Sequence, residues 1–291
     1  MASPPVRPEF DVPELDARYP LPASARAELG EHGHLTLRGV LEAAEITAVR
    51  SAVHRAAARV PALEPTATEG EAYARAFRQH TNLWRVDPGV ARFTLAPRLA
   101  RLAAELLGVV AVRLYHDQAL FKLPGGSATP WHQDKHYWPI DQEMLTLWMP
   151  LVDLEPDMGE LHFARGSHLG GALSDHPISA ASQDELAALV RRRGHEVVGT
   201  GAMRAGDVSV HLAWTAHAAG ANATATCREA MTVIWMPDGA HVLPPATAGQ
   251  RADLSTWLPG LQPGDLAASA LNPRAPAPAQ TPPPDASAVR R

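Results

Sequence analysis

The sequence predicts a mainly β protein with flanking helices, whose strands form a β-sandwich or a jelly-roll barrel. Apolar residues first recur at helical spacing, in residues 41–60 and 99–107, and in several later segments the period changes to two. Helices followed by many short strands, without regular alternation of the two, are typical of an antiparallel sheet assembly buttressed by helices.

The helical segments are expected in three places. Ile46, Val49 and Val53 define the first amphipathic face, and residues 99–107 define a second one that ends at Gly108. A third, surface helix is expected over residues 182–193, where a serine precedes a glutamate by three residues and a glycine follows. Four segments alternate with period two and predict strands: residues 109–121, 144–152, 207–213 and 228–236.

The length of 291 residues, 46% of them hydrophobic, suits one large domain. We expect this domain over residues 36–272, between an N-terminal extension over residues 1–35 and a Pro/Ala-rich tail over residues 273–291, both poorly ordered. Glu64 to Arg85 lacks a clear period, and is expected to be either a lid over the substrate or a surface loop.

Composition also narrows the class of partner. The net charge is −5 with both signs mixed along the chain, so a footprint for nucleic acid or an anionic membrane is not expected, and a small molecule is the default partner. Apolar runs stay well below the ~18 residues of a membrane span, and we expect a cytoplasmic protein. Because Cys227 is the only cysteine, histidines and carboxylates are the available strong metal ligands.

A candidate metal site begins after the turn at Gly125 and Gly126. In an extended chain, residues two apart point the same way, so His132 and Asp134 would share one face. They would supply two positions of a facial triad, and His217, at the end of a later strand, is the candidate for the third. The opposite face of such a metal is open to a 2-oxo acid and dioxygen.

Two further groups of residues accompany this pattern. Arg228 lies at the start of the strand after His217, where its guanidinium is suited to bind a carboxylate through two hydrogen bonds. Lys122 and Lys135 are the only lysines among 26 basic residues, and both lie near the metal motif, so they are site candidates. His132 and His136 would suit zinc on a helix, but Pro130 and Pro139 favour an extended chain there.

These segments resemble the phytanoyl-CoA dioxygenase family over roughly residues 34–273. The resemblance implies a double-stranded β-helix (jelly-roll, cupin-like) core that uses iron(II), 2-oxoglutarate and O2. The motifs that carry it are Tyr115–Lys122, Trp131–Pro139, Gly159–Leu161, Gly166–His168, Gly206–Val208, His217–Asn222 and Arg228.

The resemblance also implies roles for individual residues. His132, Asp134 and His217 hold iron, and Arg228 binds the carboxylate of the cosubstrate. Three more positions match the cosubstrate pocket of relatives, namely Trp148, Gln118 and Lys122. Substrate contacts are expected from residues that follow the metal motif or a later turn, namely Lys135, Tyr137, Trp138 and His168. Tyr137 and Trp138 are equally well explained as pocket or packing residues. His168 is more simply explained as a turn cap.

Two departures from the family pattern stand out. Ala219 replaces a hydroxyl residue that the family often has two positions after the distal histidine, so one hydrogen bond to the cosubstrate is either missing or supplied from elsewhere. Arg165 replaces a frequent proline before Gly166. Because position 134 is Asp and not Gly or Ala, the resemblance is to hydroxylases and not to halogenases.

The resulting hypothesis is a 2-oxoglutarate-dependent dioxygenase that hydroxylates, or otherwise oxidises, an unactivated C–H bond of a small molecule such as a natural-product intermediate. Two alternatives stay open. A cupin-like binding protein without catalysis would not need the complete triad with Arg228, and a metal-dependent hydrolase would not need the arginine. The sequence leaves the substrate and the oxidative outcome undetermined.

Overall fold

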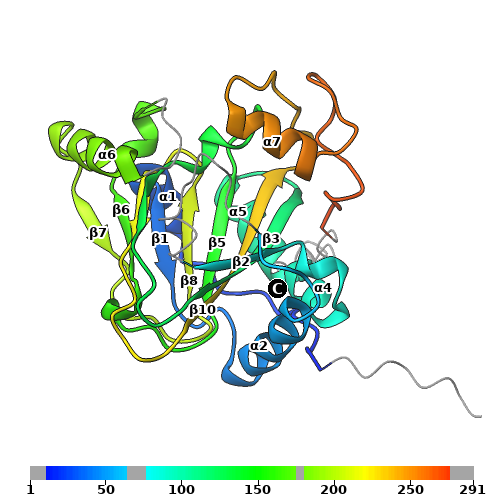
Figure 1. Cartoon of the computed structure of the whole chain (residues 1–291). Coiled ribbons are helices and arrows are strands. Elements are labelled where there is room, and N and C mark those ends of the chain that lie inside the picture. The colour runs from blue at the N-terminus through cyan, green and yellow to red at the C-terminus, as the bar shows by residue number, and fades with distance from the viewer. Residues whose placement is uncertain (1–10, 64–76, 175–179, 276–291) are drawn as a thin grey trace, which may run out of the picture.

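A computed structural model describes residues 11–63, 77–174 and 180–275. Its core consists of two antiparallel sheets (Figure 1). In the first sheet the strand order is β1 (His34–Leu37), β8 (Val208–Leu212), β5 (Leu145–Pro150), β10 (Arg228–Pro237), β3 (Val112–Lys122), β2 (Arg78–Thr81). In the second sheet the order is β4 (Thr129–His132), β9 (His217–Ala219), β6 (Leu161–Ala164), β7 (Val197–Gly199).

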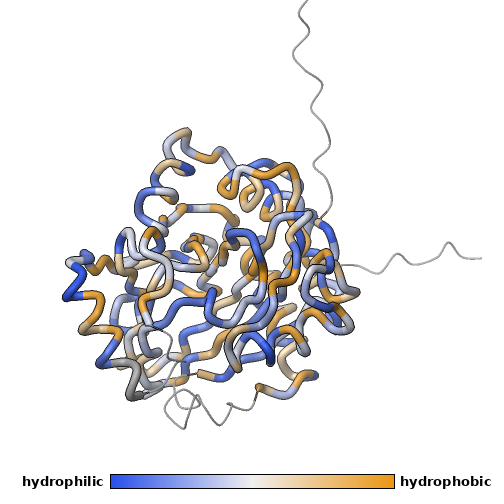
Figure 2. The backbone as a smooth tube through the Cα atoms, turned by 90° about the horizontal axis from the view of Figure 1, so that it is seen from above, coloured by the Kyte–Doolittle hydropathy of each residue, from blue (hydrophilic) through white to orange (hydrophobic). Residues whose placement is uncertain are grey.

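The long strands alternate between two environments, as a period of two requires. In β10, Val233 and Trp235 belong to the main hydrophobic core, whereas Thr232 and Ile234 face a cavity between the sheets. The same alternation in β3, β5 and β8 gives the larger sheet one apolar face and one face with polar side chains. Figure 2 accordingly shows both hydrophobic and hydrophilic stretches crossing the middle of the molecule.

Helices cover the apolar face of the larger sheet. α5 (Pro97–Leu107) contacts β3, β5 and β10, and it ends at Gly108, whose φ of 70° is left-handed as the sequence predicts for the stop. α2 (Ala43–Ala57) packs on α4 (Pro88–Thr94) in the same core. The first two predicted helices and all four predicted strands are therefore present. The other α-helices of the described chain are α1 (Ala25–His32), α6 (Ala180–Arg192) and α7 (Ala248–Trp257). α6 corresponds to the third predicted helix, whereas the sequence did not predict α1, α4 or α7.

The N-terminal segment differs from the expectation of a poorly ordered extension. From residue 11 onward it packs on the domain, because Val12 and Leu15 are almost fully buried and α1 adds Leu29 to the same core. A segment rich in proline and charge thus attaches through a few apolar side chains. At the other end, Asn272 donates to the carbonyls of Leu114 and Tyr115, and residues 276–291 lie outside the described chain.

The region predicted as an irregular loop is described only in part. Residues 64–76 lie outside the described chain, but β2 forms from Arg78 to Thr81 and pairs with β3. The prediction is wrong for these residues, because an edge strand needs only one partner and carries no strong period of its own.

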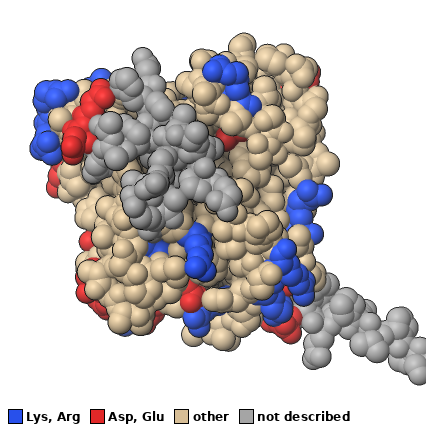
Figure 3. Space-filling view, in the orientation of Figure 1, with Lys and Arg blue, Asp and Glu red and all other residues tan. Residues whose placement is uncertain are grey.

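None of the described helices combines the length and apolar character needed to cross a membrane. On the face drawn in Figure 3, charged side chains of both signs are scattered among other residues.

Candidate active site

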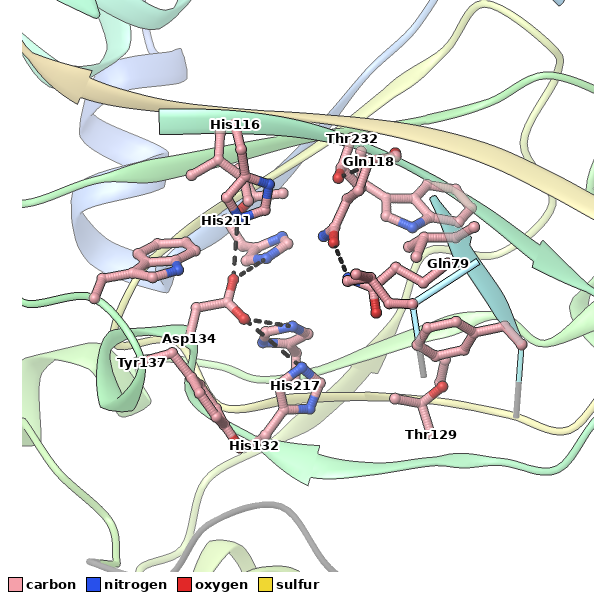
Figure 4. Close-up of a pocket in the computed structure, with 18 of the residues that line it drawn as sticks. Gln79, His116, Gln118, Thr129, His132, Asp134, Tyr137, His211, His217 and Thr232 are labelled. Carbon is pink, nitrogen blue, oxygen red and sulfur yellow. Dashed lines mark hydrogen bonds and ion pairs between the residues drawn. The ribbon is translucent and has the colours of Figure 1, made fainter. Parts of the chain in front are cut away.

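The three predicted metal ligands meet where β4 and β9 pair. His132 ends β4 and lies opposite His217, the first residue of β9, with ring centroids 4.0 Å apart. Asp134 follows two residues after His132, and its Oδ1 is 3.7 Å from Nε2 of His132 and 3.8 Å from Nε2 of His217. One ligand atom from each residue lies within 4.8 Å of the other two. Figure 4 shows the three side chains converging.

Neighbouring groups fix which atoms face this point. Nδ1 of His132 lies 2.8 Å from the carbonyl of Pro130, and Nδ1 of His217 lies 2.9 Å from that of Thr215. A carbonyl can only accept, so each Nδ1 carries the proton and each Nε2 keeps a lone pair for a metal. Such orienting partners are typical of metal-binding histidines.

The second oxygen of Asp134 is held from the other side. Its Oδ2 is 3.3 Å from Oγ1 of Thr146 and 3.3 Å from Nε2 of His211, which leaves Oδ1 directed at the histidine pair. Burial alone would raise the pKa of Asp134, but the nearby histidines, His217 first, hold it well below its usual range. Burial lowers the pKa of His217 to about 4. At neutral pH the group therefore offers the Asp134 carboxylate and the neutral imidazole of His217, and with His132 these side chains make up the donor set of a facial-triad iron site.

The chain around Asp134 corrects one expectation. Residues Asp134 to His136 form a single turn of 3-10 helix, so the extended chain predicted as far as Pro139 ends at Gln133. His132 and Asp134 still converge because residues 132 and 133 are extended. His136 turns away and packs edge-on against Trp214, with ring centroids 5.5 Å apart. A helical zinc pair of His132 with His136 is therefore not formed.

A cavity of about 460 Å³ opens beside the three ligands and is lined by both sheets. Of the predicted site residues, Gln118, Trp148, Tyr137 and Trp138 line it. Gln118 accepts a short hydrogen bond from the side chain of Gln79 (Figure 4). The space is large enough for a bidentate 2-oxo acid and part of a further small molecule.

Arg228 is buried in the wall of this cavity, only 2% exposed. Its Nη1 donates to the carbonyl of Gly159 at 3.0 Å, and its guanidinium lies 5.4 Å from the ring centroid of Trp148. Nε has no hydrogen-bond partner, and within the described ranges no carboxylate pairs with this arginine. Burial lowers the pKa of Arg228 to about 10, so it stays charged at neutral pH. A buried, unpaired guanidinium is suited to binding a ligand carboxylate.

Three other predicted site residues do not line the cavity. Nζ of Lys122 donates to the carbonyls of Ser127 and Gly220 and to Oγ1 of Thr129. Nζ of Lys135 donates to the carbonyls of Ile140 and Gln142. His168, in the short 3-10 turn Ser167–Gly170, contacts the carbonyl of Gly30 at 3.0 Å. Direct substrate contacts from Lys135 and His168 thus have no support in this structure.

Several cavity residues were missed from the sequence. His211 shares one face of β8 with Ser209, and its Nε2 reaches Asp134. His116 lies on the cavity face of β3, with its ring centroid 4.7 Å from that of Trp257. Period-two alternation marks both histidines as facing one side of a strand, but it does not tell which side holds the site. α7 contributes four more lining residues, Ala252, Asp253, Thr256 and Trp257.

Comparison with known proteins agrees with this geometry. Residues 29–230 match the family profile described as phytanoyl-CoA dioxygenase, which is more than half of the chain. This chain belongs to the phytanoyl-CoA dioxygenase family. Among curated members, it is 26% identical over 196 residues to the ectoine dioxygenase of Sphingopyxis alaskensis, and 30% identical over 121 residues to a probable alpha-ketoglutarate-dependent hypophosphite dioxygenase of Stutzerimonas stutzeri. These matches cover 60% and 38% of this chain, and 63% and 40% of the relatives' own lengths.

Solved structures of the family share the fold. A non-heme alpha ketoglutarate dependent carbocyclase from nogalamycin biosynthesis superposes with a TM-score of 0.72 at 25% identity, over 88% of this chain and 97% of the other. An epimerase of the same biosynthesis, solved with Fe3+, alpha ketoglutarate and nogalamycin RO, gives a TM-score of 0.71 at 24% identity, over 87% and 97%. The predictions of the family and of the jelly-roll fold are confirmed.

Proposed function

We propose that this protein oxidises an unactivated C–H bond of a small molecule, with iron bound by His132, Asp134 and His217 and 2-oxoglutarate bound by Arg228. The observation that carries the proposal is the shared cavity. It places three convergent ligand atoms along one space with a buried arginine that has no acidic partner among the described residues, although these side chains come from three strands and a 3-10 turn.

Each residue has a distinct task in this proposal. Nε2 of the two histidines and Oδ1 of Asp134 would hold the metal, while His211 and Thr146 hold the second carboxylate oxygen from the other side. Arg228 holds the distal carboxylate and so orients the 2-oxo acid end toward the metal. Bound iron, with 2-oxoglutarate and O2, supplies the oxidising power that no side chain has.

In its simplest form the reaction balances as R–H plus 2-oxoglutarate plus O2 giving R–OH, succinate and CO2. One oxygen atom enters succinate and the other enters the product. Buried aromatic walls at Trp138 and Trp148 exclude water and keep the oxidation on the bound molecule. Desaturation, epimerisation and ring closure are alternative outcomes of the same C–H cleavage.

A natural-product intermediate is the substrate class we favour. It is supported by the carbocyclase and the epimerase of nogalamycin biosynthesis, whose folds match along most of this chain. Aromatic side chains in the cavity, Tyr137, Trp138 and Trp257, suit a ring-bearing molecule. We also infer that the reaction takes place in the cytoplasm, where 2-oxoglutarate is a common metabolite.

The decisive experiment measures succinate formed from 2-oxoglutarate by anaerobically iron-loaded protein after oxygen is admitted. We expect slow turnover without added substrate, and loss of it by at least about a hundredfold in His132→Ala and in Arg228→Ala. His136→Ala is the matched control, since this histidine packs on Trp214 outside the cavity. Iron-loaded wild type that consumes neither 2-oxoglutarate nor oxygen would reject the proposal and favour a binding protein or a hydrolase.

A further inference from the structure

One face of α7 lies along the cavity, and a glycine stands on that same face. The α7 residues that line the cavity are Ala252, Asp253, Thr256 and Trp257. Gly249 precedes them by three, four, seven and eight positions, which is the spacing of one helix face. Glycine is a poor helix former and alanine is the best one. The glycine in the first turn of α7 therefore needs a physical reason.

The reason is the ring of Tyr137, which fills the space that a side chain at position 249 would need. A Cβ built on Gly249 would lie 2.7 Å from Cδ1 and 3.1 Å from Cε1 of Tyr137, and 3.6 Å from the carbonyl oxygen of His136. The shortest of these distances is far below the roughly 3.5 Å of a favourable contact between two carbon atoms. Position 249 therefore admits no side chain while Tyr137 stays in this place.

Hydrogen bonds hold the first turn of α7 against the chain beside this ring. Oγ1 of Thr247, the N-cap of α7, donates to the carbonyl of His136 at 2.9 Å. Nε2 of Gln250 donates to the carbonyl of Lys135 at 3.4 Å. Both carbonyls belong to the 3-10 turn that directly precedes Tyr137. Because α7 is fastened at this point, a methyl group at position 249 would have to displace the ring itself.

A displaced ring would enter the cavity. Tyr137 borders α7 at Gly249 and also lines the cavity, where Figure 4 shows it beside Asp134. Its backbone cannot follow the ring, because its N–H donates to the carbonyl of Asp134 at 2.9 Å. The movement that relieves the contact is therefore a rotation of the side chain away from α7, toward the space beside the candidate metal ligands.

We propose that Gly249 is the positioning residue for Tyr137, and that this pair keeps the space beside the metal open for a substrate with at least two rings. A Tyr137 ring turned into the cavity would take up the volume of one six-membered ring, so the substrate would lose that much space. Molecules with a single ring would still fit. The proposal rests on the proposed function, because it assumes that the substrate lies beside the metal in this cavity.

The first test follows the Tyr137 ring in protein labelled with 3-fluorotyrosine. Tyr137→Phe identifies its fluorine NMR signal among those of the four tyrosines, and Mn(II) in the metal site speeds the relaxation of nearby nuclei steeply with proximity. Gly249→Ala should raise this relaxation rate at least about twofold, because overpacking forces a side chain out of its position. Gly30→Ala is the matched control in helix α1, since a Cβ there meets nothing within 4 Å, and it should change nothing.

The second test measures the binding of phenol and 2-naphthol, probes of one and two rings, by ligand-observed NMR. The protein is loaded with Zn(II) and saturated with 2-oxoglutarate, so that no turnover is needed. Gly249→Ala should weaken 2-naphthol binding about tenfold and phenol binding less than twofold, and Gly30→Ala should weaken neither. In a Tyr137→Ala background, Gly249→Ala should no longer weaken 2-naphthol binding, because the ring it displaces is absent.

Each other outcome has a defined meaning. An unchanged relaxation rate in Gly249→Ala, equal losses for both probes, or a loss that persists in the Tyr137→Ala background would overturn the role of Gly249. Wild type that binds 2-naphthol no more tightly than phenol would overturn it too. If Mn(II) leaves the Tyr137 signal of wild type unchanged, the proposed function itself fails. Circular dichroism checks folding; if Gly249→Ala does not fold, Tyr137→Trp takes its place and should show the same selective loss.

Discussion

The cavity has two walls that differ in how they are built. The strand-built wall consists of the three candidate metal ligands, Trp148 and Arg228, all within the family match of residues 29–230. All of them stand on strands of the two sheets except Asp134, which lies in the turn after β4. The α7 wall consists of Ala252, Asp253, Thr256 and Trp257, which lie beyond that match. Buried hydrogen bonds hold the first, whereas the second joins β3 through a hydrogen bond of 3.0 Å from Tyr115 to Asp253 and the ring contact of His116 with Trp257.

This difference suggests that the two walls bind different ligands. A rigid strand-built wall suits the proposed metal and cosubstrate, whose reacting atoms must be held in one geometry. A single helix outside the family match is free to vary with the substrate. Substitutions in the two walls should therefore affect different binding events.

The largest effect is expected at Arg228. Arg228→Lys keeps a positive charge but loses the planar fork, so 2-oxoglutarate affinity of Zn(II)-loaded protein should fall about 100-fold while metal affinity stays within twofold. Calorimetric titration of both ligands measures this. Arg78→Lys, at an exposed lining position, is the control and should change neither. Equal 2-oxoglutarate affinity in wild type and Arg228→Lys would remove Arg228 from the cosubstrate site.

The next effect concerns His211, which supports Asp134 from behind. His211→Phe removes the contact with Oδ2, so the carboxylate loses its fixed orientation and metal affinity should fall about 10- to 100-fold. Competition with a chromophoric chelator gives the affinity. His162→Phe, on a half-exposed histidine of β6, should leave it unchanged. If both variants bind metal like wild type, Asp134 is oriented by other contacts.

A smaller effect is expected on stability in acid, and it comes from His116 of β3, which contacts Trp257 of the α7 wall. Burial lowers the pKa of His116 from 6.5 to about 4, so the unfolded state takes up the proton first and stability is lost as pH falls from 6.5 toward 4. Metal-free His116→Asn should therefore lose less stability between pH 7 and pH 4.5 than wild type, by on the order of 2 kcal/mol. Urea unfolding at both pH values measures this. Burial raises the pKa of Asp117 to about 7, which makes stability change with pH in the opposite direction. Because both proteins contain Asp117, its contribution cancels when they are compared.

The smallest effect on the cosubstrate should come from the α7 wall. Trp257→Ala and Asp253→Asn should leave metal and 2-oxoglutarate affinity within about twofold, because Asp253 accepts from Tyr115 and Trp257 packs on His116, and neither of these partners is a candidate ligand. Titrations on the Zn(II)-loaded variants test this. A tenfold loss of 2-oxoglutarate affinity in either variant would break the comparison, since α7 would then belong to the cosubstrate site.

The strand-built wall could largely be predicted from the sequence, and the α7 wall could not. His132, Asp134, His217 and Arg228 stand in a motif order that few other sites share, and long strands such as β10 carry a clear period of two. Lys122 is predicted to belong to the cosubstrate pocket, whereas its Nζ donates to the carbonyls of Ser127 and Gly220 and the residue does not line the cavity. A sequence pattern does not give the direction of a side chain. α7 has a weak apolar pattern with no fully buried side chain, and its place over β3 depends on contacts made far along the chain.

The most direct test of the account is whether the metal and 2-oxoglutarate share one site. Titration of 2-oxoglutarate into metal-free and Zn(II)-loaded wild type should give at least about a hundredfold higher affinity with metal, because the 2-oxo acid end binds the metal while Arg228 holds the other end. That gain should disappear in His217→Ala. Equal affinity with and without metal would contradict the account, because the three ligands and Arg228 would then serve separate sites.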